Sequence, residues 1–284
     1  MNNSPPVFEI RNVTKAFAAR QAFLRKLISP VPPVIAVDSV SLDVQQGEVL
    51  GIIGESGSGK TTLGFMLADL EPASRGEILY RSRPLQSMRG AERAGFRKKV
   101  QMVFQDSSSA LNPRRSIRQT LQDSLRLGGT PRSARRAAVD ELLQKVGLSP
   151  EHGNRYPHQL SGGQRQRVGI ARALAMQPEV IIADEPVSAL DVSLQAQIIN
   201  LLRQLQREFG LTIVLISHDI AVVRHSCQRV GVMHEGKLVE IGDVSQVVFQ
   251  SRHPYTRHLV ASVPKGLVSP GSASDDHNNR ERNL

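Results

Sequence analysis

Apolar residues occur along this chain in short runs separated by longer stretches of mixed polarity. Three near-continuous apolar runs, at 49–53, 180–183 and 212–216, predict central strands whose two faces are both covered. The stretches between these runs have helical character, which favours crossover connections and a parallel sheet. The pattern therefore predicts an α/β core.

Two segments near the start show the alternation of half-buried strands. Residues 7–13 alternate between apolar and polar side chains, and a second strand pattern at 37–44 ends in the turn Gln45-Gln46-Gly47. The stretch between them, 18–35, contains three prolines and is interpreted as an inserted loop with one short amphipathic turn. Towards the other end, a hairpin is predicted around His234-Glu235-Gly236.

Composition changes along the chain and indicates how it is divided. Residues 107–165 are mostly helical and rich in arginine, which predicts a helical subdomain inside a domain that spans 1–264. A distinct C-terminal segment is expected at 245–264. The last stretch, 265–284, is strongly polar and is expected to be a disordered tail.

The overall composition is that of a globular protein. The 284 residues are 40% hydrophobic and 22% charged, and no window approaches 18 uninterrupted apolar residues. The first residues lack the basic region and apolar stretch of a secretory signal. The single cysteine, Cys227, excludes an internal disulfide and a multi-cysteine metal site. We therefore expect a cytosolic location.

Basic residues exceed acidic ones, 36 to 26, and the formal net charge is +10. A basic surface suits nucleic acid, anionic lipid or an acidic partner, although a solvated surface is the simplest interpretation. Several arginines crowd one stretch: Arg114, Arg115, Arg118, Arg126, Arg132, Arg135 and Arg136.

The segment Gly54-Glu55-Ser56-Gly57-Ser58-Gly59-Lys60-Thr61 matches the phosphate-binding pattern G-x-x-x-x-G-K-[ST]. It follows an apolar run and precedes a helical pattern, and this context distinguishes it from a glycine-rich turn that matches by chance. Glycines let backbone N–H groups surround phosphates, and the helix N-terminus adds a favourable dipole. Lys60 is expected to reach the β- and γ-phosphates of a nucleotide, and Thr61 to offer a hydroxyl to Mg²⁺.

Two acidic residues follow the apolar run at 180–183. Asp184 lies at the predicted C-terminal tip of that strand, where a carboxylate suits a Mg²⁺ site. Glu185 comes next and is the candidate for polarising an attacking water. Two acids that simply face solvent are the alternative, but the phosphate-binding segment upstream argues against it.

A pentapeptide, Leu160-Ser161-Gly162-Gly163-Gln164, lies about 20 residues before this acidic pair. Ser161 is a favourable helix N-cap, and the glycines permit close approach of the backbone to a ligand. The start of such a helix attracts anions. Yet the upstream segment already provides the phosphate site of this chain.

Taken together and in order, the motifs resemble those of the ATPase subunit of an ABC transporter, over roughly residues 7–264. The motifs that carry the resemblance are 54–61, Gln105, 160–164, 180–185, 188–191 and His218. The resemblance implies a P-loop NTPase core with an antiparallel β region and a helical subdomain, the ABC ATPase cassette.

The resemblance also implies a role for each motif. Catalytic roles fall to Glu185, His218, Lys60 and Gln105. Contacts with ATP fall to Phe17, Gly54, Glu55, Ser56, Gly57, Ser58, Gly59, Lys60, Thr61 and Thr62. The ligands expected for Mg²⁺ are Thr61, Gln105 and Asp184. Residues expected to cover the ATP of the opposite subunit are Ser161, Gly162, Gly163 and Gln164.

The assignments of Gln105 and His218 depend on their position relative to the other motifs and not on residue type. The resemblance also gives roles to Asp191 and Phe17. Asp191 closes the segment called the D-loop and is expected at the interface of a dimer. Phe17 occupies the place of the aromatic residue that stacks on adenine. A phenylalanine of the hydrophobic core remains an open alternative there.

Two further segments resemble the oligopeptide/dipeptide importer branch, which also includes nickel and glutathione importers. They are Gln105-Asp106 with Leu111-Asn112-Pro113-Arg114, and His253-Pro254-Tyr255-Thr256-Arg257 with Leu259 and Val263-Pro264. A plain terminal helix begun by Pro254 is the alternative for the second segment. Many members carry C-terminal cysteines that bind an iron–sulfur cluster; this chain lacks them, so we expect no such cluster.

The resemblance implies ATP hydrolysis that drives import of peptides or a related small solute. Expected partners are two membrane permease subunits, a second identical or related ATPase subunit and, indirectly, a substrate-binding protein. The chain would lie peripherally at the cytoplasmic side of the inner membrane. Two alternatives stay open: an accessory ATPase of a phosphonate-cleaving complex, and a soluble ABC-type ATPase acting on nucleic acid. With 4% aromatic residues for base stacking, no nucleic-acid partner is expected.

Overall fold

The computed structural model describes residues 5–18, 32–105, 111–188 and 190–262. The expected disordered tail at 265–284 lies outside these residues, and so does the 19–31 part of the expected inserted loop. Residues 34 and 35 were also assigned to that loop, and this was wrong: they begin a strand.

In the described part of the chain, the larger sheet has six strands in the order β10-β9-β3-β8-β7-β6. Its parallel centre consists of β3 (Val49–Ile53), β8 (Thr212–Ser217), β7 (Val180–Asp184) and β6 (Val100–Val103). Every residue of β3, β7 and β8 is buried, which explains their continuous apolar sequences. The hairpin of β9 (Arg229–His234) and β10 (Lys237–Asp243) extends the sheet beside β3. The predicted parallel core and hairpin are confirmed.

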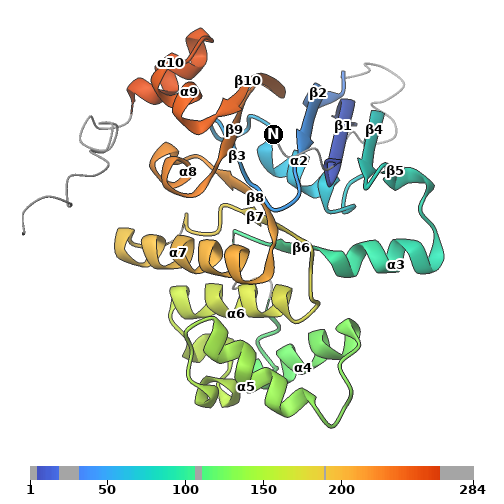
Figure 1. The fold of residues 1–284 in the computed structure, drawn as a ribbon, viewed down its shortest axis with the longest axis vertical. Coiled ribbons are helices and arrows are strands. Elements are labelled where there is room, and N and C mark those ends of the chain that lie inside the picture. Colours follow the sequence, from blue (N-terminus) through green and yellow to red (C-terminus); the bar gives the residue numbers. More distant parts are fainter. Residues whose placement is uncertain (1–4, 19–31, 106–110, 189, 263–284) are drawn as a thin grey trace, which may run out of the picture.

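A smaller antiparallel sheet packs against this core in the order β2-β1-β4-β5. Its strands are β1 (Phe8–Phe17), β2 (Val34–Val44), β4 (Arg75–Tyr80) and β5 (Arg83–Pro84). One apolar cluster joins Ile10 of β1, Leu50 of β3 and Met66 of α2 (Lys60–Leu67). The expected antiparallel β region is therefore present, on the side of the larger sheet where the phosphate-binding segment lies (Figure 1).

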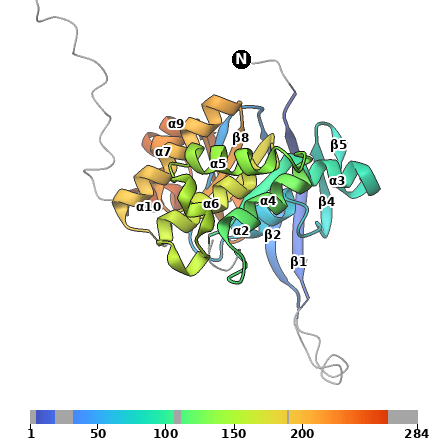
Figure 2. The ribbon, with the colours of Figure 1, turned by 90° about the horizontal axis from the view of Figure 1, so that it is seen from below.

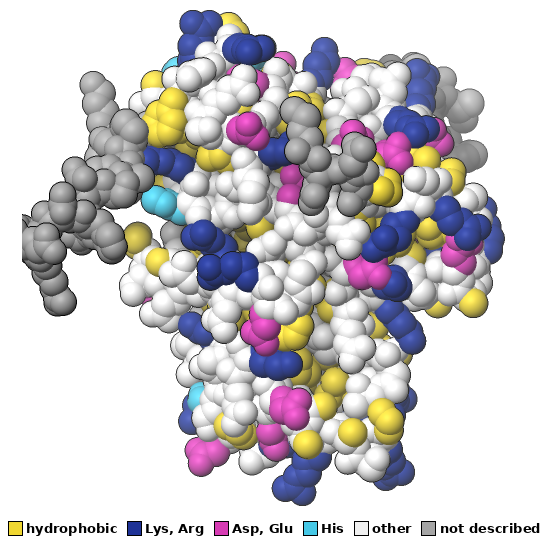
Figure 3. Space-filling model, viewed as in Figure 1, with side chains coloured by type: hydrophobic (Ala, Val, Ile, Leu, Met, Phe, Trp, Pro, Cys, Tyr) yellow, Lys and Arg dark blue, Asp and Glu magenta, His cyan; other side chains and the backbone are white. Residues whose placement is uncertain are grey.

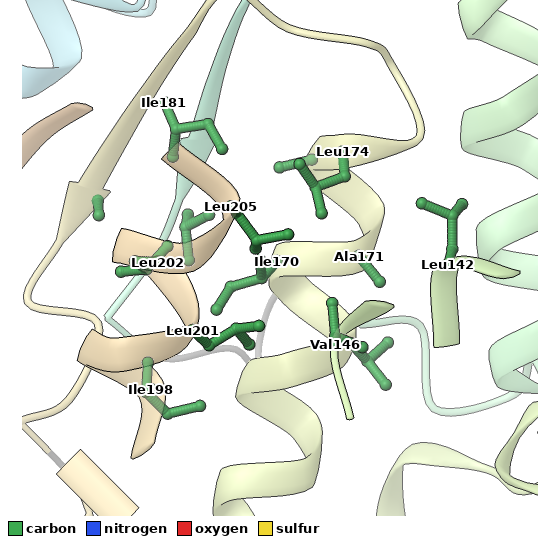
Figure 4. Packing of buried hydrophobic residues seen from close by; sticks show 14 of the residues in the cluster. Leu142, Val146, Ile170, Ala171, Leu174, Ile181, Ile198, Leu201, Leu202 and Leu205 are labelled. Atoms are coloured by element: carbon green, nitrogen blue, oxygen red, sulfur yellow. The ribbon is translucent and has the colours of Figure 1, made fainter. Parts of the chain in front are cut away.

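The helical part of the chain extends from the opposite end of the molecule (Figures 1 and 2). It contains α4 (Ile117–Gly128), α5 (Arg135–Lys145) and α6 (Gly162–Leu174), with 3₁₀ turns at Pro150–Asn154 and Pro157–Gln159. Figure 4 shows Ile170 of α6 pointing toward Leu201 and Leu205 of α7 (Val192–Phe209), while Ala171 points toward Val146 beyond α5. Helix α6 thus joins the helical part to the core.

The remaining helices lie around the larger sheet. Helix α3 (Gly90–Lys99) leads into β6, α8 (Ile220–Ser226) contacts β3 and β8, and α9 (Val244–Phe249) contacts β9 and β10. The chain's last described helix, α10 (Pro254–Ala261), begins at a proline, as the sequence suggested. Throughout the described ranges, we find no helix whose length and apolar character would let it cross a membrane.

Some arginines of the arginine-rich stretch form ion pairs within the helical part. Arg115 pairs with Asp123 at 2.9 Å, and Arg118 pairs with Asp140 at 2.8 Å. Figure 3 shows basic side chains spread over one face of the molecule among acidic ones, not gathered in a single patch. On the face that Figure 3 shows, this mixture of charges is typical of a solvated surface and gives no continuous basic track.

Glu179, just before β7, links the two sheets. Its carboxylate accepts hydrogen bonds from the Tyr80 hydroxyl at 2.8 Å and from Arg81 at 2.8 and 3.0 Å, and it pairs with Lys99. Burial raises the pKa of Glu179, but the hydrogen bonds, first that from Lys99, outweigh it and hold this pKa at about 2. Burial and the bond to Glu179 raise the pKa of Tyr80 to about 12.

Replacing Glu179 with glutamine is therefore expected to destabilise the fold by about 1–2 kcal/mol at pH 7. Because the folded-state pKa is depressed, the carboxylate stabilises the protein fully above its unfolded pKa of about 4.3. This contribution is lost as the pH falls from about 5 towards 2. Urea unfolding at a series of pH values measures the difference, with the exposed Glu208→Gln on α7 as control. A difference that did not shrink at low pH would contradict this role of the carboxylate.

Candidate functional site

The phosphate-binding segment connects β3 to α2 and needs its glycines. Gly54, Gly57 and Gly59 have φ angles of 152°, 81° and 99°, in the region that favours glycine. A Cβ atom at Gly54 would lie 2.1 Å from the Met233 carbonyl oxygen, and one at Gly59 would lie 2.2 Å from that of Ala36. The loop can therefore take this path only with glycine at these positions.

Lys60, the first residue of α2, folds back over the loop. Its ammonium group donates hydrogen bonds to the carbonyl oxygens of Gly54, at 2.8 Å, and Glu55, at 2.7 Å. The side chain is buried, and burial lowers its pKa, while nearby carboxylates, foremost that of Glu185, act in the opposite direction. The sequence thus places one buried cation at the centre of a loop whose N–H groups favour anions.

The next residue of α2 meets the end of β7. The Thr61 hydroxyl donates a hydrogen bond to the Asp184 carboxylate at 2.9 Å. Burial raises the pKa of Asp184, and the bond from Thr61 partly offsets this. A hydroxyl and a carboxylate oxygen beside a phosphate-binding loop form the donor set that Mg²⁺ takes in nucleotide sites. The residues present therefore fit a Mg²⁺ ion.

Glu185 and His218 follow the ends of the neighbouring strands β7 and β8. The Glu185 carboxylate lies 3.2 Å from the Nδ1 atom of His218. Glu185 has a φ of 44°, unusual for a residue with a side chain, and its N–H donates to the Ile216 carbonyl at 2.9 Å. A positive φ in a residue with a side chain stores backbone strain. The arrangement places a carboxylate, which can accept a proton, in contact with a histidine.

Most of these groups line one cavity of 820 Å³; Asp184 is not on its wall and reaches it through the hydrogen bond from Thr61. Two residues that the sequence analysis did not assign, Ala36 of β2 and Leu259 of α10, also line it. The predicted site residues on its wall are Gly54, Glu55, Ser56, Gly57, Gly59, Lys60, Thr61, Thr62, Gln105, Glu185 and His218. Segments from distant parts of the chain thus converge as the motif order predicted.

Two residues predicted to contact ATP are not among the described residues on this wall. Ser58 is buried in the loop, and its carbonyl accepts a hydrogen bond from the Gly236 N–H at 3.1 Å. Phe17, at the end of β1, is 39% exposed, so the alternative of a core phenylalanine is wrong. The Lys15 ammonium lies 4.9 Å from the centre of its ring. Stacking of Phe17 on adenine stays a prediction.

The pentapeptide at 160–164 begins α6 at a distance from this wall. The Ser161 hydroxyl accepts a hydrogen bond from the Gln164 N–H at 3.3 Å, and the Gln164 side chain accepts one from the Ser161 N–H at 3.0 Å. This capping box confirms Ser161 as the N-cap. The described part of the 820 Å³ cavity wall includes none of residues 160–164. Ser161 and Gly162 are instead exposed, as a surface for a second molecule requires.

Asp191 has a comparable local role at the start of α7. Its carboxylate accepts a hydrogen bond from the Leu194 N–H at 2.9 Å and caps the helix. The following Val192 is 81% exposed. The start of α7 is therefore accessible to a second molecule.

Residues 37–188 match the protein family described as ABC transporter. The match covers more than half of the chain and includes the phosphate-binding loop, the pentapeptide and the acidic pair. This chain belongs to the ABC transporter family. The fold and the resemblance predicted from the sequence are confirmed.

Individual relatives of this ABC ATPase are ATP-binding proteins of importers. It is 46% identical over 265 residues to the oligopeptide transport ATP-binding protein AppF of Bacillus subtilis, covering 92% of this chain and 79% of AppF. It is 46% identical over 260 residues to the glutathione import ATP-binding protein GsiA of Escherichia coli, covering 91% of this chain and 41% of GsiA. The chain is therefore similar to importer ATPases across nearly its whole length.

A similar cassette of known structure is a dimer. The structure described as a dimeric post-hydrolysis state of the ATP-binding cassette MJ0796, bound to ADP and Pi, matches with a TM-score of 0.71 and 30% identity. The match covers 84% of this ABC ATPase and 98% of that chain.

Proposed function

We propose that this ABC ATPase hydrolyses ATP to drive import of peptides or a related small solute through separate membrane permeases. The observation that carries the proposal is the convergence of Lys60, Thr61, Glu185 and His218 on one cavity, with Asp184 hydrogen-bonded to Thr61 behind its wall. The names of the relatives supply the direction of transport and the class of substrate.

In this proposal, each residue has one role in hydrolysis. The loop N–H groups and Lys60 bind the β- and γ-phosphates. Thr61 and Asp184 would hold Mg²⁺, with Gln105 from the end of β6 nearby, and the ion would neutralise phosphate charge when bound. Water then attacks the γ-phosphorus, its proton passes to Glu185, and the bond to the ADP oxygen breaks. His218 orients the Glu185 carboxylate through the 3.2 Å contact.

A second ATPase subunit completes the site in this proposal. Ser161 and Gly162 are exposed at a helix N-terminus, where an anion is favoured. They would cover the γ-phosphate of ATP bound by the partner subunit, and Asp191 with Val192 would lie at the same interface. The dimeric state of MJ0796 supports this arrangement. Two permease subunits, and a substrate-binding protein acting through them, complete the complex at the cytoplasmic side of the inner membrane.

Replacing Ser161 with arginine is expected to leave ATP binding by the isolated subunit within about 3-fold of wild type. In the assembled complex, the same change should lower hydrolysis by about 10²-fold or more, because the pentapeptide at 160–164 then no longer stabilises the partner's γ-phosphate. Equilibrium binding and phosphate release measure the two effects.

Helix α4 offers a matched control for the Ser161 variant. It begins with the same capping box, formed by Ser116 and Gln119. Ser116→Arg removes an equivalent cap, worth about 1 kcal/mol, without changing the pentapeptide at 160–164. If both variants lost the same activity, or if Ser161→Arg abolished ATP binding by the monomer, the role across the interface would be wrong.

Purification of the intact complex tests the proposed function. We expect the chain to co-purify with two permeases and to show ATPase activity that a peptide-loaded binding protein stimulates. Salt-sensitive binding to DNA or RNA without permeases would support the nucleic-acid alternative. Stable association with the soluble subunits of a phosphonate-cleaving complex would support the other.

A further inference from the structure

The C-terminal helix α10 contacts the phosphate-binding loop directly. The hydroxyl of Tyr255 accepts a hydrogen bond from the Glu55 backbone N–H at 3.1 Å. The Tyr255 ring stacks on His234, at the end of β9, with ring centres 3.8 Å apart and planes inclined by 23°. A residue 200 positions away along the chain therefore holds the first turn of the loop.

Helix α10 is itself firmly anchored. The Glu240 carboxylate of β10 accepts hydrogen bonds from the N–H groups of Arg252, at 2.9 Å, and His253, at 3.1 Å. On the helix, Thr256 is completely buried, and Leu259 packs in one apolar cluster with Ile53 and Ile220. The anchor fixes the position from which Tyr255 reaches the loop.

The same apolar cluster lies next to both the phosphate-binding loop and His218. Ile53 is the last residue of β3, immediately before the phosphate-binding loop, and Ile220 begins α8, two residues beyond His218. Leu259 contacts this cluster and lines the 820 Å³ cavity as well. Helix α10 therefore spans the elements that carry the loop and the histidine.

A second tie holds the same loop from the β9–β10 turn. The Gly236 N–H donates a hydrogen bond to the Ser58 carbonyl at 3.1 Å. The loop itself is rich in glycine, and ordering glycine costs more conformational entropy than ordering any other residue. The hydrogen bonds at Glu55 and Ser58 already order the loop before a ligand binds. Less conformational entropy is then lost on binding.

We propose that Tyr255 is a positioning residue of the nucleotide site: its hydroxyl fixes the Glu55 amide and preorganises the phosphate-binding loop for ATP. The C-terminal segment is then a structural part of the nucleotide site. Tyr255 acts through the loop backbone and not on the reacting atoms, so its effect falls on ATP binding. This inference rests on the proposed ATP-binding function.

Tyr255→Phe tests the inference, because phenylalanine keeps the ring on His234 and removes only the hydroxyl. In the full chain, we expect the Kd for ATP to rise by about 2- to 10-fold, the loss of one neutral hydrogen bond. Hydrogen exchange of the Glu55 amide should become faster, and the melting temperature without nucleotide should stay within about 2 °C of wild type. In the assembled transporter, KM for ATP should rise while kcat stays within about 2-fold.

Tyr156→Phe is the matched control. Tyr156 also stacks on a histidine, His158, with ring centres 5.9 Å apart and planes inclined by 17°. Removing its hydroxyl should leave the Kd of the isolated subunit and Glu55 exchange unchanged. A Tyr255→Phe chain with wild-type Kd and wild-type Glu55 exchange would overturn the inference alone. A wild-type chain that failed to bind ATP would overturn the proposed function, and this inference with it.

Discussion

The variant Glu185→Gln is expected to bind ATP and to hydrolyse it 10²–10⁴-fold more slowly than wild type, the typical cost of losing a general base. Glutamine has the size and hydrogen-bonding reach of glutamate, but it cannot accept the proton of the attacking water. Lys60, Thr61 and Asp184 are untouched, so the phosphate and metal contacts remain. Removing one negative charge beside the triphosphate should favour the ATP-bound state.

Single-turnover hydrolysis and ATP retention measure this prediction in the assembled complex. The variant should accumulate a closed dimer loaded with ATP. Glu179→Gln is a suitable control, because it makes the same substitution at the other end of β7, where the carboxylate serves stability. Near-normal hydrolysis by the Glu185→Gln complex would mean that another group activates the water. His218, 3.2 Å from the carboxylate, would then be the first to test.

Lys60→Ala is expected to remove ATP binding as well as turnover. The Lys60 cation lies buried against the loop carbonyls of Gly54 and Glu55, from which it can reach both terminal phosphates. Hydrogen bonds to charged groups contribute about 1.5–3 kcal/mol each, so two such contacts correspond to about 10²–10⁴-fold in Kd. Unlike Glu185→Gln, this change weakens the ground state and the transition state together.

Calorimetric titration with ATP measures the effect of Lys60→Ala. The exposed Lys98→Ala on α3 removes the same charge outside the cavity and should bind like wild type. Thermal unfolding checks that the variant is folded. A folded Lys60→Ala chain with full affinity for ATP would show that the loop is not the phosphate site.

Much of the core and of the site could be predicted because their signals are local. The runs that became β3, β7 and β8 are almost entirely apolar since both faces of each strand are covered. The glycine spacing of the phosphate-binding loop and the Ser161 cap likewise depend on a few consecutive residues. Strand ends of a parallel sheet meet at one edge, so Gln105, Asp184 and His218 converge once the strands are correct.

What the sequence analysis missed depends on tertiary contacts. β4 and β5 were not predicted, because the buried residues of β4 are confined to its last three positions and β5 has only two residues. Val34 and Ile35 join β2 by pairing with Phe17 and Ala16 across the sheet, although their neighbours in sequence include prolines. Tyr255 contacts the phosphate-binding loop and Leu259 lines the cavity only because α10 packs against the loop. No local sequence pattern predicts this packing. The individual catalytic and binding roles remain predictions for the variants above.

Peptide uptake by the reconstituted complex decides whether this chain powers import. The chain and its co-purified permeases, placed in vesicles with a peptide-loaded binding protein, should accumulate peptide only when ATP is present on the side of the ATPase subunits. Phosphate release should accompany uptake, and the Glu185→Gln complex should lose both by at least about 10²-fold. Uptake that continued at the wild-type rate in the Glu185→Gln complex, or ATP hydrolysis that neither permeases nor peptide influenced, would contradict the proposed function.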